Sequence, residues 1–239
     1  MIIRTLKLFL TAAFFLTVPN LSFAQVSLGT VIDFENGSLG GFQGGSALAP
    51  SLQPMVITDP VGGDNALQIS TSGDFSGQGH ALQIFNNINS DLSAVSTILF
   101  DVTNPNTEDL NIRISISGGS AAGNFTDPSG AFTSNDIILQ AGATLSLGFD
   151  LSASNFQQIS GTDSLAQTLS SVQQLRIFHN PAVVASPFGL AGADAIGGLE
   201  NPSAGTLVID NVAFVPEPSS ASLIFGAAGF LMARCRRCV

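Results

Sequence analysis

Short apolar runs separated by turn-forming residues set the strongest limit on what this chain can fold into. The runs are rich in Val, Ile, Leu, Phe and Thr, and clusters of Gly, Asn, Asp, Ser and Pro separate them. Runs of this length and composition are typical of β-strands that end in turns. We therefore predict strands over residues 30–35, 54–58, 66–71, 81–85, 96–103, 110–117, 136–140, 144–150, 173–179 and 206–214.

The pattern inside these runs indicates antiparallel sheets with one buried face. In residues 111–117, isoleucines alternate with polar side chains, as expected for a half-buried antiparallel strand. The sequence Ala-Leu-Gln-Ile occurs at 66–69 and again at 81–84, and we expect these two copies to pair as a hairpin. We predict one short helix, at 164–170, and a long loop at 180–205.

The N-terminal residues have the pattern of a secretory signal peptide. Arg4 and Lys7 precede an apolar segment at 8–18, and Ser22-Phe23-Ala24 provides a small-x-small cleavage site before Gln25. We assign 1–24 to the signal peptide and expect the protein to be exported.

The C-terminal residues combine a proline-rich motif, an apolar segment and a cationic end. The motif Val215-Pro216-Glu217-Pro218 precedes an apolar run, and Arg234, Arg236 and Arg237 follow it. This order resembles the PEP-CTERM sorting signal, which implies a transmembrane helix at about 219–233 and cleavage by an exosortase-type membrane protease. The expected path is an inner-membrane-anchored precursor followed by the cell surface or the extracellular matrix.

The remaining body, residues 25–214, is long enough for one domain and is strongly acidic. Arg113 and Arg176 are its only cationic residues apart from histidine, against 16 acidic residues, so its net charge is −14. A surface with so few cations is a poor partner for nucleic acid, whereas divalent cations and neutral polymers suit it better. Both cysteines, Cys235 and Cys238, lie in the tail, so the body contains no disulfide.

Three short motifs in the body suggest a fold family. Residues 31–35 read Val-Ile-Asp-Phe-Glu, 62–69 read Gly-Gly-Asp-Asn-Ala-Leu-Gln-Ile, and 208–212 read Val-Ile-Asp-Asn-Val. Their order resembles the galactose-binding-like jelly rolls, a group that includes many carbohydrate-binding modules. The resemblance implies an all-β, antiparallel β-sandwich of jelly-roll type whose first and last strands lie together.

The same resemblance implies one structural calcium ion held by carboxylates from both ends of the body. Glu35 and Asp210 match the family positions, Asp64 is the expected third ligand and Asp33 a fourth. Calcium takes six to eight oxygen ligands, which carboxylates and carbonyls supply. The alternative is that these are solvated carboxylates at strand ends.

Nothing in the body has the pattern of a catalytic centre, and we predict that the protein is not an enzyme. Its two histidines, His80 and His179, lack a recognisable partner spacing, and the sequence contains no G-x-S-x-G motif. Two functions remain open. The first is a non-catalytic surface or matrix component, and the second is a carbohydrate-binding module that anchors the cell or the matrix to polysaccharide.

Aromatic residues distinguish these two functions. The chain has no Trp and no Tyr, the usual platforms for sugar rings, so only Phe could serve. A binding module should bring phenylalanines of the connections together with Asn, Gln or Arg on one concave face, whereas a scaffold should have this groove filled. The candidates in connections are Phe42, Phe75, Phe125, Phe132 and Phe188.

Overall fold

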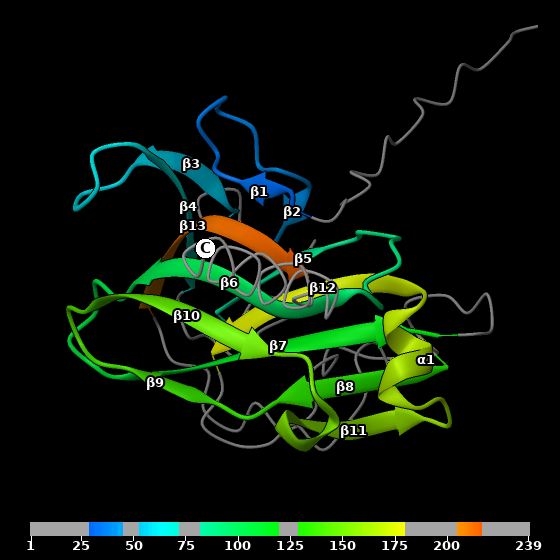
Figure 1. The fold of residues 1–239 in the computed structure, drawn as a ribbon. Helices are drawn as coiled ribbons and strands as arrows, with labels where there is room; N and C mark the ends of the chain where they lie inside the picture. The colour runs from blue at the N-terminus through cyan, green and yellow to red at the C-terminus, as the bar shows by residue number, and fades with distance from the viewer. Residues whose placement is uncertain (1–28, 45–52, 72–81, 120–128, 180–204, 217–239) are drawn as a thin grey trace, which may run out of the picture.

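The body is a sandwich of two antiparallel β-sheets (Figure 1). The structure is a computed structural model, and it describes residues 29–44, 53–71, 82–119, 129–179 and 205–216. All strand pairs are antiparallel within these ranges. This confirms the antiparallel strands that the sequence pattern predicts and the all-β sandwich that the resemblance to jelly rolls implies.

The first sheet, sheet A, contains both the first and the last described strands. Its order is β10-β6-β13-β4-β3, and β1 pairs with the far end of β13. The long strand β13 therefore lies in the middle and touches β1, β4 and β6. The bounds are β1 Val31–Ile32, β3 Met55–Thr58, β4 Asn65–Thr71, β6 Val95–Thr103, β10 Thr144–Asp150 and β13 Gly205–Pro216.

The second sheet, sheet B, has the order β11-β8-β7-β12-β5-β2, with β9 on the free part of β7. Its central strands β7 and β12 are long and almost wholly buried. The bounds are β2 Phe42–Gln43, β5 Gln83–Asn86, β7 Leu110–Gly118, β8 Gly130–Ser134, β9 Ile137–Leu139, β11 Phe156–Gly161 and β12 Val172–His179.

The core lies between the sheets and follows the predicted alternation. Ile112, Ile114 and Ile116 of β7 are each 0% exposed and belong to one cluster with side chains of sheet A. In sheet A, Phe100 stacks on Phe149 with their ring centroids 5.6 Å apart. Residues that alternate with these core positions point to the outer faces of the two sheets. In β7 these residues, Arg113, Ser115 and Ser117, are buried as well, so the prediction of a half-buried strand was wrong for its outer face.

The predicted helix is present as α1, Leu165–Leu169, and its local sequence explains its bounds. Ser164 caps the N-terminus, and Gln167 completes a capping box with it. Leu165 and Leu169 are buried against the sandwich. A 3₁₀ turn at Ala153–Asn155 precedes β11.

Two strand predictions were wrong in their pairing or extent. The copies of Ala-Leu-Gln-Ile do not form a hairpin, because β4 belongs to sheet A and β5 to sheet B. The first strand ends at Ile32 instead of residue 35, because Phe34 has the left-handed φ of 57° and cannot continue a strand. The strands β2, β8 and β11 had not been predicted.

The two ends of the chain and the loop at 180–204 lie outside the described residues, so the signal peptide and the apolar tail are not observed. No helix within the described ranges is long and apolar enough to cross a membrane.

Candidate functional site

The outer face of sheet A carries a hollow whose floor consists of two rows of side chains. The first row crosses three strands, because Asp210 of β13 pairs with Asp101 of β6, and Asp101 pairs with Ser146 of β10. All three positions alternate with core residues, so their side chains point outward. The second row lies beside the first on the same strands and consists of Val208, Thr103 and Thr144.

The turn between β3 and β4 forms a side wall of this hollow. The turn is closed by a 2.7 Å hydrogen bond from the Asp59 amide to the Asp64 carbonyl. The Asp59 carboxylate also accepts the Val61 amide at 2.9 Å, a local bond typical of Asp in turns. Asp59, Val61, Gly62 and Asp64 line the hollow, which has a volume of about 320 Å³. We call this site the acidic hollow.

A β-bulge in β13 places two neighbouring polar side chains at the acidic hollow. The register of β13 against β6 shifts between Asp210 and Ala213, and Asn211 has a left-handed φ of 52°. Consecutive residues of a regular strand point to opposite faces, but here both Asp210 and Asn211 line the hollow. The Asn211 side-chain amide donates to Asp101 Oδ2 at 2.9 Å and to Asp210 Oδ2 at 3.1 Å.

Burial and neighbouring carboxylates make the ionised form of Asp210 unfavourable. Its pKa is raised to about 6, mainly by desolvation. The hydrogen bond from the Asn211 backbone amide opposes this shift, and the charges of Asp64, Asp101 and Glu35 add to it. Like charges directly opposite each other on paired strands destabilise a sheet. The Asp210–Asp101 pair is therefore a local cost to the fold, which is the kind of feature that a binding site retains.

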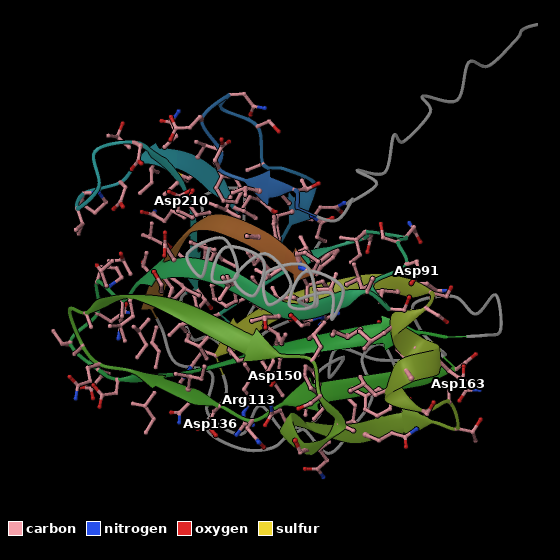
Figure 2. The ribbon with its side chains drawn as sticks, viewed as in Figure 1. Asp91, Arg113, Asp136, Asp150, Asp163 and Asp210 are labelled. Atoms are coloured by element: carbon pink, nitrogen blue, oxygen red, sulfur yellow. The ribbon has the colours of Figure 1, made fainter. Side chains whose placement is uncertain are left out.

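Three of the four predicted calcium ligands lie near one another. Glu35, after β1, accepts the Asn65 amide through Oε1 at 3.0 Å, and its carbonyl accepts the Asn65 side chain at 3.1 Å. These bonds hold Glu35 beside Asp64, at the start of β4. Both carboxylates are close enough to Asp210 to raise its pKa. Figure 2 shows Asp210 beside β4, far from Asp163 next to α1.

The fourth predicted ligand, Asp33, is not part of this group. Its Oδ1 accepts the Glu35 amide at 3.3 Å, and it neither lines the hollow nor contributes to the pKa of Asp210. Among the described residues, no group of three or more acidic, His or Cys side chains is arranged so that it could hold a metal ion. The oxygen-only donors suit calcium in kind, but their side chains would have to move to bind it.

The first two residues of the predicted sorting motif belong to the sandwich. Val215 and Pro216 are the last residues of β13, opposite Thr97 and Val95 of β6. The structure thus extends the predicted last strand by two residues beyond Phe214. Glu217, Pro218 and the C-terminal arginines, Arg234, Arg236 and Arg237, lie outside the described residues.

The outer face of sheet B carries both body arginines, but this face is buried. Arg176 of β12 donates to Gln83 Oε1 at 2.8 Å and to Gln174 Oε1 at 2.7 Å, and its guanidinium lies 5.6 Å from the Phe85 ring centroid. Burial lowers the pKa of Arg176 to about 9. Phe178, on the same face, is 0% exposed although it does not belong to the main core cluster.

Arg113, one strand away, is held by a carboxylate. Its Nη2 lies 3.1 Å from Asp136 Oδ1, and its Nη1 donates to the Ser134 carbonyl at 2.8 Å (Figure 2). Burial lowers the pKa of Arg113, and the Asp136 charge opposes that shift. Sheet B therefore combines Arg, Gln and Phe on one face, as a binding module would, but these side chains are packed inside the molecule.

The phenylalanines expected in connections do not form an exposed platform within the described residues. Phe42 is 1% exposed and Phe132 6%, and both are part of the core. Phe75, Phe125 and Phe188 lie outside the described ranges. His80 also lies outside them, whereas His179 is buried and accepts the Asn111 amide through Nδ1 at 2.8 Å.

Comparison with known proteins identifies no family. No protein-family model matches the chain, and no curated protein matches it either. Among solved structures, the family 11 carbohydrate-binding module from Clostridium thermocellum, in complex with a β-1,3-1,4-mixed-linked tetrasaccharide, is 16% identical. That match covers 80% of this chain and 98% of the other, with a TM-score of 0.48.

A second similar structure is CBM27-1 from Caldicellulosiruptor saccharolyticus in complex with mannohexaose. It is 14% identical over 80% of this chain and 99% of the other, with a TM-score of 0.41. At such identities and TM-scores the likeness carries no argument about function. The fold and the site define an all-β sandwich with an acidic hollow on one outer face, and its function has to be inferred from its own residues.

Proposed function

We propose that this chain is an exported, non-catalytic protein of the cell surface or extracellular matrix, with a jelly-roll sandwich that binds a neutral polysaccharide at the acidic hollow. The observation that carries this proposal is the composition of the hollow. Hydroxyl groups, carboxylates and the Val208 side chain form its floor, and Val61 stands at its edge. A sugar residue presents hydroxyl groups at its edge and C–H groups on its faces, so it needs both kinds of partner.

The acceptors of the hollow suit hydroxyl donors. An ionised carboxylate only accepts hydrogen bonds, through about four lone-pair sites. Asp101 receives bonds from Ser146 and Asn211, and Asp210 receives two from Asn211. Each carboxylate therefore has acceptor capacity beyond these bonds. Because the described residues that line the hollow include no Lys, Arg or His, an anionic polymer would be repelled.

Aliphatic side chains take the place of the missing Trp and Tyr. Val61 is 65% exposed and lines the hollow. Leu99, also exposed, lies two residues before Asp101 on the outer face of β6. Exposed large apolar side chains on the face that carries the hollow favour a contact surface over a bland solvated face.

A glycan array probed with the purified protein tests this function. The panel should include the mixed-linked β-1,3-1,4-glucan tetrasaccharide and mannohexaose, together with anionic polymers as a contrast. We expect binding to neutral glycans and at least a tenfold higher Kd for Asp101→Asn, because a hydrogen bond to a charged group contributes about 1.5 to 3 kcal/mol. Asp109→Asn, at an exposed carboxylate that does not line the hollow, is the matched control. Absence of binding to every glycan would contradict the proposal.

A structural calcium ion is proposed to bind beside the acidic hollow. Its support is that Glu35, Asp64 and Asp210 come from both ends of the body and lie near one another. Burial raises the pKa of Asp210, and the charges of Asp64 and Glu35 add to this shift. A divalent cation between them would remove the repulsion between these carboxylates. The proposed role is to tie the loop after β1 and the start of β4 to β13, with no part in catalysis.

Delivery to the surface is proposed to depend on the PEP-CTERM signal and an exosortase-type protease. Because β13 ends at Pro216, cleavage after this residue would leave every described strand intact. We expect the triple change of Pro216, Glu217 and Pro218 to Ala, or deletion of 234–239, to leave uncleaved protein in the inner membrane. Mass spectrometry of the surface fraction checks this, with Pro105→Ala, an exposed loop proline, as the control. A released wild-type protein that still ends in Cys238 and Val239 would contradict it.

A further inference from the structure

Asp101 and Asp210 bring two carboxylates close together, and one residue holds both of them. The two carboxylates are direct partners on adjacent antiparallel strands, where side chains lie closest. Left alone, they would repel each other and turn apart. Within the described part of the chain, Asn211 is the residue that bonds to both.

Asn211 occupies a backbone position that would suit glycine better. Its φ of 52° lies in the left-handed region, which glycine enters without cost and Asn more easily than most other residues. An Asn at this bulge therefore supplies something that Gly cannot. The difference between the two is the side-chain amide, whose nitrogen lies 2.9 Å from Asp101 Oδ2 and 3.1 Å from Asp210 Oδ2.

The remaining bonds complete the alignment of the two carboxylates. The Asn211 backbone amide donates to Asp210 Oδ1 at 2.7 Å, and the Ser146 hydroxyl donates to Asp101 Oδ1. Each carboxylate is therefore fixed through both of its oxygens. Bonds of this kind, which hold a binding group from outside, determine whether a site is preorganised.

We infer that Asn211 is a positioning residue. Its side-chain amide holds Asp101 and Asp210 side by side, so that both present free acceptor sites to a bound saccharide. This inference rests on the proposed polysaccharide binding at the acidic hollow. Asn211 acts through the two carboxylates, and its role is separate from closing the bulge.

The test removes the amide and keeps the backbone conformation. In Asn211→Gly the left-handed φ remains favourable and the backbone bond to Asp210 remains possible. We expect the Kd of the full-length chain for the mixed-linked tetrasaccharide or mannohexaose, whichever binds the wild type, to rise at least tenfold. The matched control is Asn89→Gly. Asn89 is exposed and also has a positive φ, 41°, and among the described residues its side-chain amide donates to the Asn87 carbonyl nearby.

A double-mutant cycle separates positioning from a merely structural role. In an Asp101→Ala background, Asn211→Gly should cost little further affinity, because the amide then has only one carboxylate to hold. A structural role would cost the same in both backgrounds. Should Asn211→Gly fail to fold, Asn211→Asp keeps the shape of the side chain and removes its N–H donors. The same loss of affinity is expected for this variant. Unchanged affinity in either folded variant would overturn the inference.

The same double-mutant cycle can be measured through the melting temperatures of the four chains in chelator, and this measurement needs no glycan. If Asn211 couples the two carboxylates, the shifts caused by Asn211→Gly and Asp101→Ala will not add. Additive shifts would overturn the inference even if glycans bind. If neither oligosaccharide nor any array glycan binds the wild type, the proposed function fails, and non-additive shifts would then support only the amide clamp on the two carboxylates.

Discussion

Calcium should raise the melting temperature of the wild-type chain, and excess chelator should lower it. A ligand that binds only the native state stabilises it by RT ln(1 + [L]/Kd), which is about 2.7 kcal/mol at a hundredfold excess over Kd. The ion would join the loop after β1 and the start of β4 to the central strand β13. Differential scanning calorimetry in millimolar calcium and in chelator measures the effect.

Replacement of Asp210 by Asn should remove most of this response. The variant keeps a side-chain oxygen but loses a formal charge next to Asp64 and Glu35, so calcium affinity should fall. Asp109→Asn, at an exposed site, should respond to calcium like the wild type. Asp163 is a poorer control than its sequence position suggests, because it is only 8% exposed beside α1. Equal wild-type melting temperatures in calcium and chelator would show that the ion does not bind.

Local sequence patterns predicted the strands and the helix whose limits are set by nearby residues. Strand β10 begins and ends where the apolar run of 144–150 does, and the alternation of Ile112, Ile114 and Ile116 predicted the buried face of β7. Helix α1 follows from a capping box between Ser164 and Gln167, three residues apart. In these cases the residues that determine the structure lie within a few positions of one another.

Strands that are stabilised mainly by distant partners were missed or misassigned. In β8 every residue is buried, yet Gly130-Ala131-Phe132-Thr133-Ser134 reads as a turn-rich connection. In β11 the polar composition reflects its place at the edge of sheet B. The repeated sequence Ala-Leu-Gln-Ile suggested that β4 and β5 pair with each other as a hairpin, but the order of strands places them in different sheets.

Some carboxylates near the hollow were indicated by the sequence, as ligands of a calcium ion whose binding stays a prediction. Resemblance to known jelly rolls indicated Glu35, Asp64 and Asp210, and the structure places them near one another. It could not indicate Asp101, which reaches Asp210 only through the register of β6 against β13. Nor did the sequence show that Asn211 forms a bulge, because the bulge depends on pairing between strands that are more than 100 residues apart.

Without calcium, the wild-type chain should lose stability relative to Asp210→Asn as the pH rises from about 4 to 7. The pKa of Asp210 is about 6 in the folded chain, above the ordinary value of 3.8, because burial and the nearby carboxylates disfavour its charge. The folded state therefore binds this proton more tightly than the unfolded state does. By linkage, its contribution to stability is present at low pH and is lost between about 3.8 and 6.

The expected size of this loss follows from the difference between the two pKa values. Since one pKa unit corresponds to 1.36 kcal/mol, a difference of about two units amounts to roughly 3 kcal/mol, as an upper limit. In chelator at pH 7, Asp210→Asn should therefore unfold at a higher urea concentration than the wild type. In calcium the order should reverse, because the wild type then gains the stabilisation of the bound ion.

Asp136→Asn provides a control of opposite sign. The Asn111 bond and the Arg113 charge lower the pKa of Asp136. Its contribution is therefore present above pH 3.8 and lost as the pH falls, so this variant should be less stable than the wild type at pH 7 and approach it under acid conditions. Urea unfolding of the three chains at several pH values in chelator tests both signs. If Asp210→Asn follows the wild-type pH profile, Asp210 ionises at an ordinary pKa, and neither burial nor the nearby carboxylates disfavour its charge.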